Sequence, residues 1–149
     1  MQTSVQEKKY EEIIAKLKKE GIRVTKVRSQ IIKVIIMNEH PTINDIRNKL
    51  EERISNINVM SIYNTLDLLL EKHLLFANTF NGKEICYEIQ DLKSVHLKCD
   101  NCLTITHIDA KELESMNTSQ LKELAIKHGL LLDHFKIEIH GLCKKCNLQ

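Results

Sequence analysis

Four of the chain's five cysteines form two pairs with the spacing of metal ligands. The first pair is Cys99 and Cys102, and the second is Cys143 and Cys146. Two residues between paired cysteines let both thiolates reach one ion, and four thiolates complete the tetrahedron that zinc prefers. Because such a site leaves no position for water, it predicts a structural Zn²⁺ and not a catalytic one. The alternative is two surface thiol pairs or disulfides, which the lack of a secretion signal disfavours.

Length and composition limit the class of protein to which these thiols can belong. The chain has 149 residues, of which 42% are hydrophobic, and its single proline and four glycines indicate a helix-rich protein with few tight turns. The formal net charge of +2 gives no argument for nucleic acid by itself. The sequence shows neither an apolar signal segment nor an apolar run long enough to span a membrane. We therefore expect a cytoplasmic protein, whose thiols stay reduced and available to metal.

The first half of the chain reads as helices followed by a hairpin. Apolar periodicity predicts helices at 5–20, 26–38, 43–50 and 59–72, and Asn81-Gly82 between two extended runs, 74–79 and 83–89, is a strong hairpin signal. The predicted N-caps are Thr25, Thr42 and Asn58, and Gly21 is the predicted stop of the first helix. Helices followed by a hairpin indicate a winged helix-turn-helix, in which the last helix enters the major groove of DNA. A generic helical bundle with a hairpin is the alternative.

The second half reads as a small α/β unit. Strands are predicted at 96–99, 103–108 and 130–140, and a helix at 118–128. Such a unit is too short to bury a large core alone, so we expect it to need the zinc and dimerisation through its sheet. The predicted fold is α+β, with a winged-helix DNA-binding domain at 1–90, a linker at 91–95 and a zinc-stapled dimerisation domain at 96–149.

Five segments in this order resemble the ferric uptake regulator family of bacterial metal-sensing repressors. They are GIRVT at 21–25 followed by Arg28, HPT at 40–42, NVMSIYNTL at 58–66, HLKCDNC at 96–102 and IHGLCKKC at 139–146. The resemblance covers nearly the whole chain. It implies a homodimer that binds an inverted-repeat, double-stranded operator DNA when a regulatory metal is loaded.

The resemblance also implies which residues meet the DNA. Tyr63 and Asn64 stand where the family contacts bases in the major groove, and Arg23 stands where a basic residue reaches into the minor groove. Asparagine at position 64, where iron regulators usually carry arginine, is similar to the peroxide-sensing branch. Without the resemblance, Tyr63 could be a partly buried aromatic, and Arg23 and Asn64 ordinary surface residues.

A second, exchangeable metal site is implied at His40, Glu88, His96 and His107. These ligands come from both halves and flank the predicted linker, so a metal held by them would fix the angle between the domains. In the family, a histidine usually stands at Ser94 and a carboxylate at His107. The resulting nitrogen-rich set weakens the case for Mn²⁺, leaves Fe²⁺ open and favours Zn²⁺ or Ni²⁺. Individually, such histidines are more often surface or core residues.

Two further features of the sequence predict no additional chemistry. The family's other peripheral metal site has lost ligands at Val95 and Phe135, although Glu114 and His134 remain, so we expect no third metal. Cys86 lies outside both cysteine pairs on a predicted strand. We expect it to be a small buried hydrophobe and not a redox sensor.

The predicted function is a dimeric, metal-dependent DNA-binding transcriptional repressor that controls metal homeostasis or a peroxide response. Sensing of iron, or of peroxide through oxidation of a histidine ligand, comes first, and sensing of zinc or nickel next. Asn64 favours the peroxide branch, whereas Ser94 removes one of the oxidisable ligands. The chain is not expected to be an enzyme, since it lacks a catalytic triad order and a phosphate loop. The alternatives are a metalloenzyme that uses His40, Glu88, His96 and His107, or a zinc-stabilised protein-interaction module.

Overall fold

The computed structural model describes residues 2–79, 82–89, 93–108 and 110–148. The chain divides into two compact units, Met1–Gln90 and Asp91–Gln149. Each unit combines helices with a small antiparallel or mixed sheet, so the predicted α+β class is confirmed.

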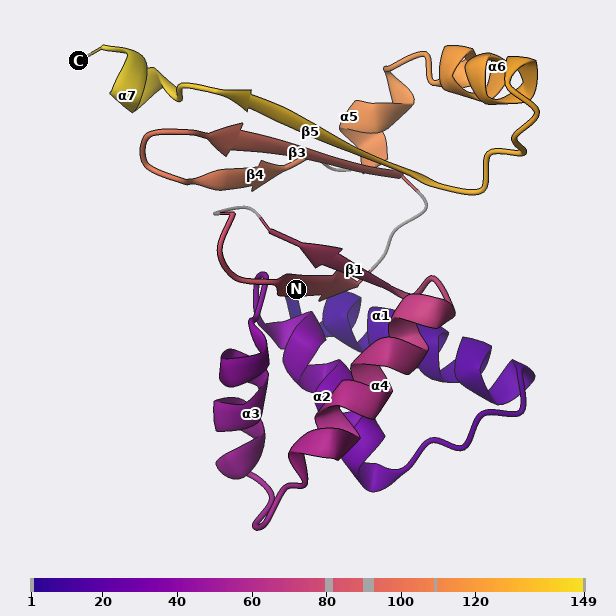
Figure 1. The fold of residues 1–149 in the computed structure, drawn as a ribbon, viewed down its shortest axis with the longest axis vertical. Helices are drawn as coiled ribbons and strands as arrows, with labels where there is room; N and C mark the ends of the chain where they lie inside the picture. Colours follow the sequence, from indigo (N-terminus) through magenta and orange to yellow (C-terminus); the bar gives the residue numbers. More distant parts are fainter. Residues whose placement is uncertain (1, 80–81, 90–92, 109, 149) are drawn as a thin grey trace. The chain divides into compact units, whose positions relative to one another are not determined.

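The first unit contains four helices and a two-stranded wing (Figure 1). These elements are α1 (Gln2–Lys19), α2 (Lys26–Met37), α3 (Ile43–Glu51), α4 (Val59–Glu71), β1 (Leu75–Asn78) and β2 (Cys86–Ile89). The strands pair antiparallel, with Leu75 opposite Ile89 and Asn78 opposite Cys86. Pairing therefore begins only at Cys86 and not at the predicted residue 83. Phe80 and Asn81, in the predicted turn, lie outside the described residues.

Side-chain caps fix where three of these helices begin. The Thr25 hydroxyl accepts a backbone hydrogen bond of 3.1 Å at the start of α2, and the Asn58 side chain accepts one of 2.9 Å at the start of α4. At the start of α3, Thr42 and Asp45 form a capping box, in which each side chain accepts the backbone N–H of the other residue. Such caps satisfy N–H groups that the helix itself leaves without partners.

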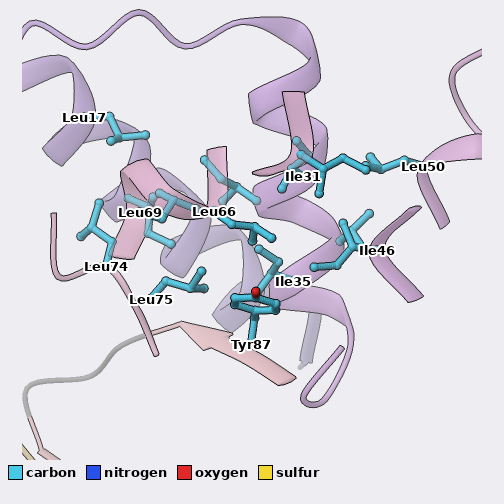
Figure 2. Close-up of a cluster of buried hydrophobic side chains, with 14 residues drawn as sticks. Leu17, Ile31, Ile35, Ile46, Leu50, Leu66, Leu69, Leu74, Leu75 and Tyr87 are labelled. Atoms are coloured by element: carbon cyan, nitrogen blue, oxygen red, sulfur yellow. The ribbon is translucent and has the colours of Figure 1, made fainter. Parts of the chain in front are cut away.

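One apolar cluster holds the helices and the wing of the first unit together. All four helices and both strands contribute, and Figure 2 shows the Tyr87 ring directed into the cluster. The buried members are Ile13, Leu17, Ile31, Ile32, Val34, Ile35, Ile46, Leu50, Ile62, Leu66, Leu69, Leu74, Leu75 and Tyr87. Because α4 buries one face in this cluster, its orientation within the first unit is fixed and its opposite face is exposed to solvent.

The second unit is built around a three-stranded sheet (Figure 1). Its elements are β3 (Lys93–Cys99), β4 (Ile105–His107), α5 (Ala110–Glu114), α6 (Ser119–Lys127), β5 (Phe135–Gly141) and α7 (Lys144–Asn147). The strand order is β4-β3-β5, with β3 antiparallel to β4 and parallel to β5.

Strand pairing explains where these elements depart from the prediction. β3 begins at Lys93, inside the predicted linker 91–95, because Lys93 pairs with Phe135. Residues 91 and 92 lie outside the described residues. The segment 130–134, predicted as strand, is irregular, and β5 begins only at Phe135. Leu103 has a left-handed φ of 60°, so the predicted strand 103–108 starts only at Ile105.

The second unit leaves much of its apolar surface exposed. Among its described residues, the buried hydrophobic ones are Val95, Cys99 and Leu113, and α6 contains no fully buried residue. Leu131, by contrast, is 88% exposed. The short helices α5 and α7 were not predicted. Among the described residues, no helix is long and apolar enough to cross a membrane.

Candidate metal centres and nucleic-acid interface

The four paired cysteines lie together in the second unit. Their sulfur atoms are all within 4.8 Å of one another, and the Sγ atoms of Cys102 and Cys143 are 3.8 Å apart. A tetrahedron with Zn–S bonds of about 2.3 Å has S–S edges of about 3.8 Å, so the donor atoms fit a tetrahedral ion of this size. All five cysteines of the chain fall within the described residues and are free thiols. The disulfide alternative is therefore not what the structure contains.

Backbone hydrogen bonds shape the first cysteine knuckle. Leu103 donates its N–H to the carbonyl of Cys99 at 2.9 Å, and Cys99 donates its own N–H to the carbonyl of Thr104 at 3.0 Å. The Cys143 N–H donates to the Cys99 sulfur at 3.3 Å. This hydrogen bond lowers the pKa of the Cys99 thiol to about 6, and the hydrogen bond from the Cys102 N–H to the same sulfur is the next largest cause. The Thr104 hydroxyl, 3.1 Å from the Cys102 sulfur, lowers the pKa of that thiol as well.

The fourth thiol of the cluster resists ionisation. The Asn101 side chain lowers the pKa of Cys146, but the adjacent Cys143 thiol, burial, and the thiols of Cys99 and Cys102 together raise it to about 11. Four thiolates at these distances repel one another, and a divalent cation at their centre removes that repulsion. The cluster thus has the number, spacing and chemistry of donors that Zn²⁺ requires.

In the first unit, His40 lies beside Glu88. The His40 Nε2 and Glu88 Oε2 atoms are 2.8 Å apart, and both side chains are largely buried. The segment before α3 runs alongside β2, because the Tyr87 N–H donates to the Pro41 carbonyl at 2.9 Å and Thr42 bridges antiparallel to Cys86. His40 itself adopts a left-handed φ of 48°. The chain therefore positions an imidazole and a carboxylate together at one place.

In the second unit, His96 lies beside His107. The two residues are direct partners in the antiparallel pairing of β3 with β4, and their ring centroids are 4.4 Å apart. His96 is fully buried, whereas His107 is exposed. Adjacent imidazoles on neighbouring strands are a recognised donor pair for a divalent metal. The side chain of Ser94, which lies two residues before His96, falls outside the described residues.

The residues left over from the family's peripheral site do not form a described cluster. Val95 is buried in the second unit, and Phe135 is the first residue of β5. Glu114 ends α5, while the His134 Nδ1 atom is 2.8 Å from the Asp133 carboxylate. Hydrogen bonding of His134 to an adjacent acid is an ordinary surface arrangement.

The outlying thiol of Cys86 lies on β2, half-buried. Burial, followed by the negative charges of Glu84 and Asp45, raises the pKa of this thiol above its usual value. A raised pKa keeps the sulfur protonated at neutral pH, and the thiol is a much weaker nucleophile than the thiolate. The local chemistry agrees with a packing role for Cys86.

The candidate DNA-contacting residues occupy exposed positions of the first unit. Tyr63 and Asn64 are on the outer face of α4, opposite the side that enters the core. Arg23 is exposed in the connection between α1 and α2. Arg28 donates a guanidinium N–H to the Arg23 carbonyl, so it holds the backbone that carries Arg23.

Sequence reasoning gave no role to two of these supporting residues. The sequence marks Arg28 only as part of a motif, and it gives no prediction for Thr104. A hydroxyl two residues after a ligand cysteine is the available signal for Thr104, but it is weak, because threonine is common in such loops.

Comparison with known proteins agrees with these features. The family model described as "Ferric uptake regulator family" matches residues 19–140. A peroxide-responsive repressor PerR from Staphylococcus epidermidis is 30% identical over 139 residues, which cover 91% of this chain and 89% of that protein. The peroxide operon regulator of Bacillus subtilis is 28% identical over 138 residues, which cover 91% of this chain and 92% of that protein.

Solved structures show the same fold. The Campylobacter jejuni peroxide stress regulator is 25% identical, with a TM-score of 0.67, covering 89% of this chain and 98% of that one. The ferric uptake regulator from Pseudomonas aeruginosa with manganese is 20% identical, with a TM-score of 0.68, covering 87% of this chain and 96% of that one. The predicted family is confirmed. The prediction that the chain is a regulator of transcription and not an enzyme is confirmed with it. This chain belongs to the ferric uptake regulator family of metal-dependent transcriptional repressors.

Proposed function

We propose that this protein is a homodimeric repressor that binds double-stranded operator DNA when a regulatory divalent metal is bound. The observation that carries the proposal is the presence of one donor pair in each unit. His40 and Glu88 pair in the unit that contains α4, and His96 and His107 pair in the other. Donors divided in this way can couple metal binding to the placement of a DNA-binding element.

The regulatory metal is assigned to His40, Glu88, His96 and His107 acting together. A metal that needs all four donors binds only an arrangement of the chain that brings both pairs to it. By linkage, the metal then shifts the population toward that arrangement by its differential affinity for the two states. DNA binding is assigned to residues 1–90, with Arg23, Tyr63 and Asn64 as contacts, and dimerisation to residues 96–149.

The four cysteines are assigned to one structural Zn²⁺ per chain, held by Cys99, Cys102, Cys143 and Cys146. A complete thiolate tetrahedron has no open position, so this zinc stabilises the fold and takes no part in sensing. Dimerisation through the second unit is supported by its exposed apolar side chains, since monomers rarely expose large apolar patches. Free thiols are maintained by a reducing compartment, which supports a cytoplasmic location.

The sensed signal is assigned to iron or peroxide. Asn64 and the names of the relatives, which are peroxide-responsive repressors, favour this branch. Because Ser94 replaces one of the two histidines that the family can oxidise, His40 is the proposed ligand that remains for oxidation by peroxide. Sensing of zinc or nickel is the second candidate, favoured by His107, because imidazole suits these metals better than manganese.

Replacing His96 tests the proposed switch. His96→Ala removes one regulatory donor, so it should abolish the metal-stimulated part of DNA binding and leave the zinc content and the dimer unchanged. The measurement is fluorescence anisotropy of a labelled duplex that covers the promoter of the protein's own gene, titrated with Fe²⁺ without oxygen, then with Mn²⁺, Zn²⁺ and Ni²⁺.

The matched control is His128→Ala, which removes an exposed histidine at the end of α6. It should bind the duplex as the unmodified protein does. Metal-stimulated binding that persists in His96→Ala would remove His96 from the regulatory site.

A further inference from the structure

Met60 is a large apolar side chain that the fold leaves 59% exposed at the start of α4. Its position is well defined, because its backbone N–H donates to the Asn58 side chain at 2.9 Å. The residues of α4 that enter the core are Ile62, Thr65, Leu66 and Leu69. Met60 therefore makes no contribution to the core that would explain an apolar residue at this position.

Met60 shares a surface row with the candidate base contacts. Tyr63 and Asn64 follow it by three and four residues, the separations at which helical side chains are neighbours on one face. Both are exposed, so the three side chains form one continuous surface over the first two turns. We call Met60, Tyr63 and Asn64 the reading row.

Charge limits which part of α4 can approach DNA. No charged residue occurs in α4 before Asp67, and a second acid follows at Glu71. Phosphates repel these carboxylates, whereas the amino end of a helix carries a partial positive charge that favours phosphate. The helix must therefore approach a duplex with its first two turns. In that orientation Met60 lies at the end that enters the groove first.

The major groove offers one apolar group to such a side chain, the 5-methyl group of thymine. Methionine is unbranched and polarizable, and it adapts to small apolar partners better than branched side chains do. We propose that Met60 determines specificity by packing against a thymine methyl group in each half-site of the operator. This inference rests on the proposed DNA-binding function.

The test uses duplexes enriched from a random-sequence library by the metal-loaded protein. Each thymine of the enriched duplex is replaced in turn by deoxyuridine, which lacks only the methyl group. Where Met60 packs against that methyl group, the unmodified protein should lose about fourfold in affinity, the effect of burying one methyl group. Met60→Ala should lose this penalty at one position in each half-site and keep the penalties at other positions.

Two further variants keep the result interpretable. Met60→Leu retains an apolar side chain and should restore sensitivity to the methyl group. Met37→Ala is the matched control, since Met37 is 54% exposed at the end of α2, outside the reading row. It should give the same penalties as the unmodified protein.

The outcomes separate the inference from the function on which it rests. If the unmodified protein enriches a sequence but Met60→Ala keeps every deoxyuridine penalty, Met60 does not read thymine and the repressor function stands. If the metal-loaded protein enriches no sequence over random duplex, the proposed function itself fails and the inference fails with it.

Discussion

At the residue scale, backbone N–H groups, first that of Cys143 and then that of Cys102, donate toward the Cys99 sulfur and lower the pKa of this thiol to about 6. Cys99→Ser removes this donor and should release the zinc. Binding energy at structural zinc sites is folding energy of about 10 kcal/mol or more, so the second unit should unfold at lower temperature and the dimer should dissociate. Zinc content per chain, thermal unfolding and size-exclusion chromatography are the measurements.

Cys86→Ser is the matched control for that substitution. Cys86 is also a free cysteine but lies on β2, outside the cluster. The control should retain its zinc and its dimer. A Cys99→Ser protein that keeps one zinc per chain and stays dimeric at micromolar concentration would show that these thiols do not hold the metal.

Asn78 shows the cost of a polar group at a core position. The residue is 2% exposed, and among the described residues neither atom of its side-chain amide has a hydrogen-bond partner. A buried, unsatisfied polar group costs about 1–3 kcal/mol. Asn78→Val should therefore raise the free energy of unfolding by about 1 kcal/mol or more, measured by chemical denaturation.

Ala77→Val controls for the effect of strand propensity in this experiment, since Ala77 is the exposed neighbour of Asn78 on β1. It should change stability by a few tenths of a kcal/mol. A loss of stability in Asn78→Val, with Ala77→Val unchanged, would mean that the amide has a partner such as a bound water.

At the scale of elements, the end of α1 depends on glycine. After α1, the Gly21 N–H donates to the Lys18 carbonyl at 3.0 Å and the Ile22 N–H to the Leu17 carbonyl at 2.9 Å, a Schellman motif. Gly21 has a φ of 73°, which disfavours any side chain. Gly21→Ala should cost about 1 kcal/mol of stability for this reason alone, because nothing lies within 4 Å of an added Cβ.

Gly141→Ala is the control for the backbone term. Gly141 also has open space around an added Cβ, but its φ is outside the left-handed region. In chemical denaturation it should change stability less than Gly21→Ala does. Equal effects of the two substitutions would show that the left-handed conformation is not what requires glycine after α1.

The sequence predicts elements well where they carry their own local signals. Thr25, Thr42 and Asn58 mark helix starts because a short polar side chain at an N-cap satisfies N–H groups within the same turn. The one-turn helix α7 has no such signal. Its hydrogen bonds, from the N–H groups of Cys146 and Asn147 to the Cys143 carbonyl, follow from the turn that brings two cysteines together.

Strand boundaries depend on partners that are distant in the sequence, and this is where prediction fails. The apolar run at 130–134 looks like strand, but β5 begins only at Phe135, where Lys93 provides a partner. The apolar pattern reports that a segment favours extended structure. It does not report which residues of another strand remain available to pair with it.

At the scale of the whole molecule, the two metal-ligand sets differ in how far they can be predicted. The cysteine pairs can be recognised from local spacing, since the two ligands of each knuckle lie three positions apart. His40 and Glu88 are 48 positions apart, and only the pairing of the segment before α3 with β2 brings them within 2.8 Å. No spacing rule in one sequence finds such a pair, so its prediction depended on resemblance to a family.

The preference of the protein for its regulatory metal links the proposed site to function, and we propose that His107 determines this preference. His107 stands where the family usually has a carboxylate, and it pairs with His96 across β3 and β4. His107→Asp exchanges a borderline nitrogen donor for a hard oxygen. Metal preference in DNA binding should therefore move toward Mn²⁺ and Fe²⁺ and away from Zn²⁺ and Ni²⁺.

Titration of the variant with each metal, followed by anisotropy of the promoter duplex, measures this order. The structural zinc must be retained throughout, so zinc per chain is determined before each titration. His128→Asp adds the same charge at an exposed position on another element and should leave the order unchanged. If His107→Asp also leaves it unchanged, His107 is not a ligand. The proposed regulatory site would then consist of His40, Glu88 and His96, with His96 as the ligand from the second unit.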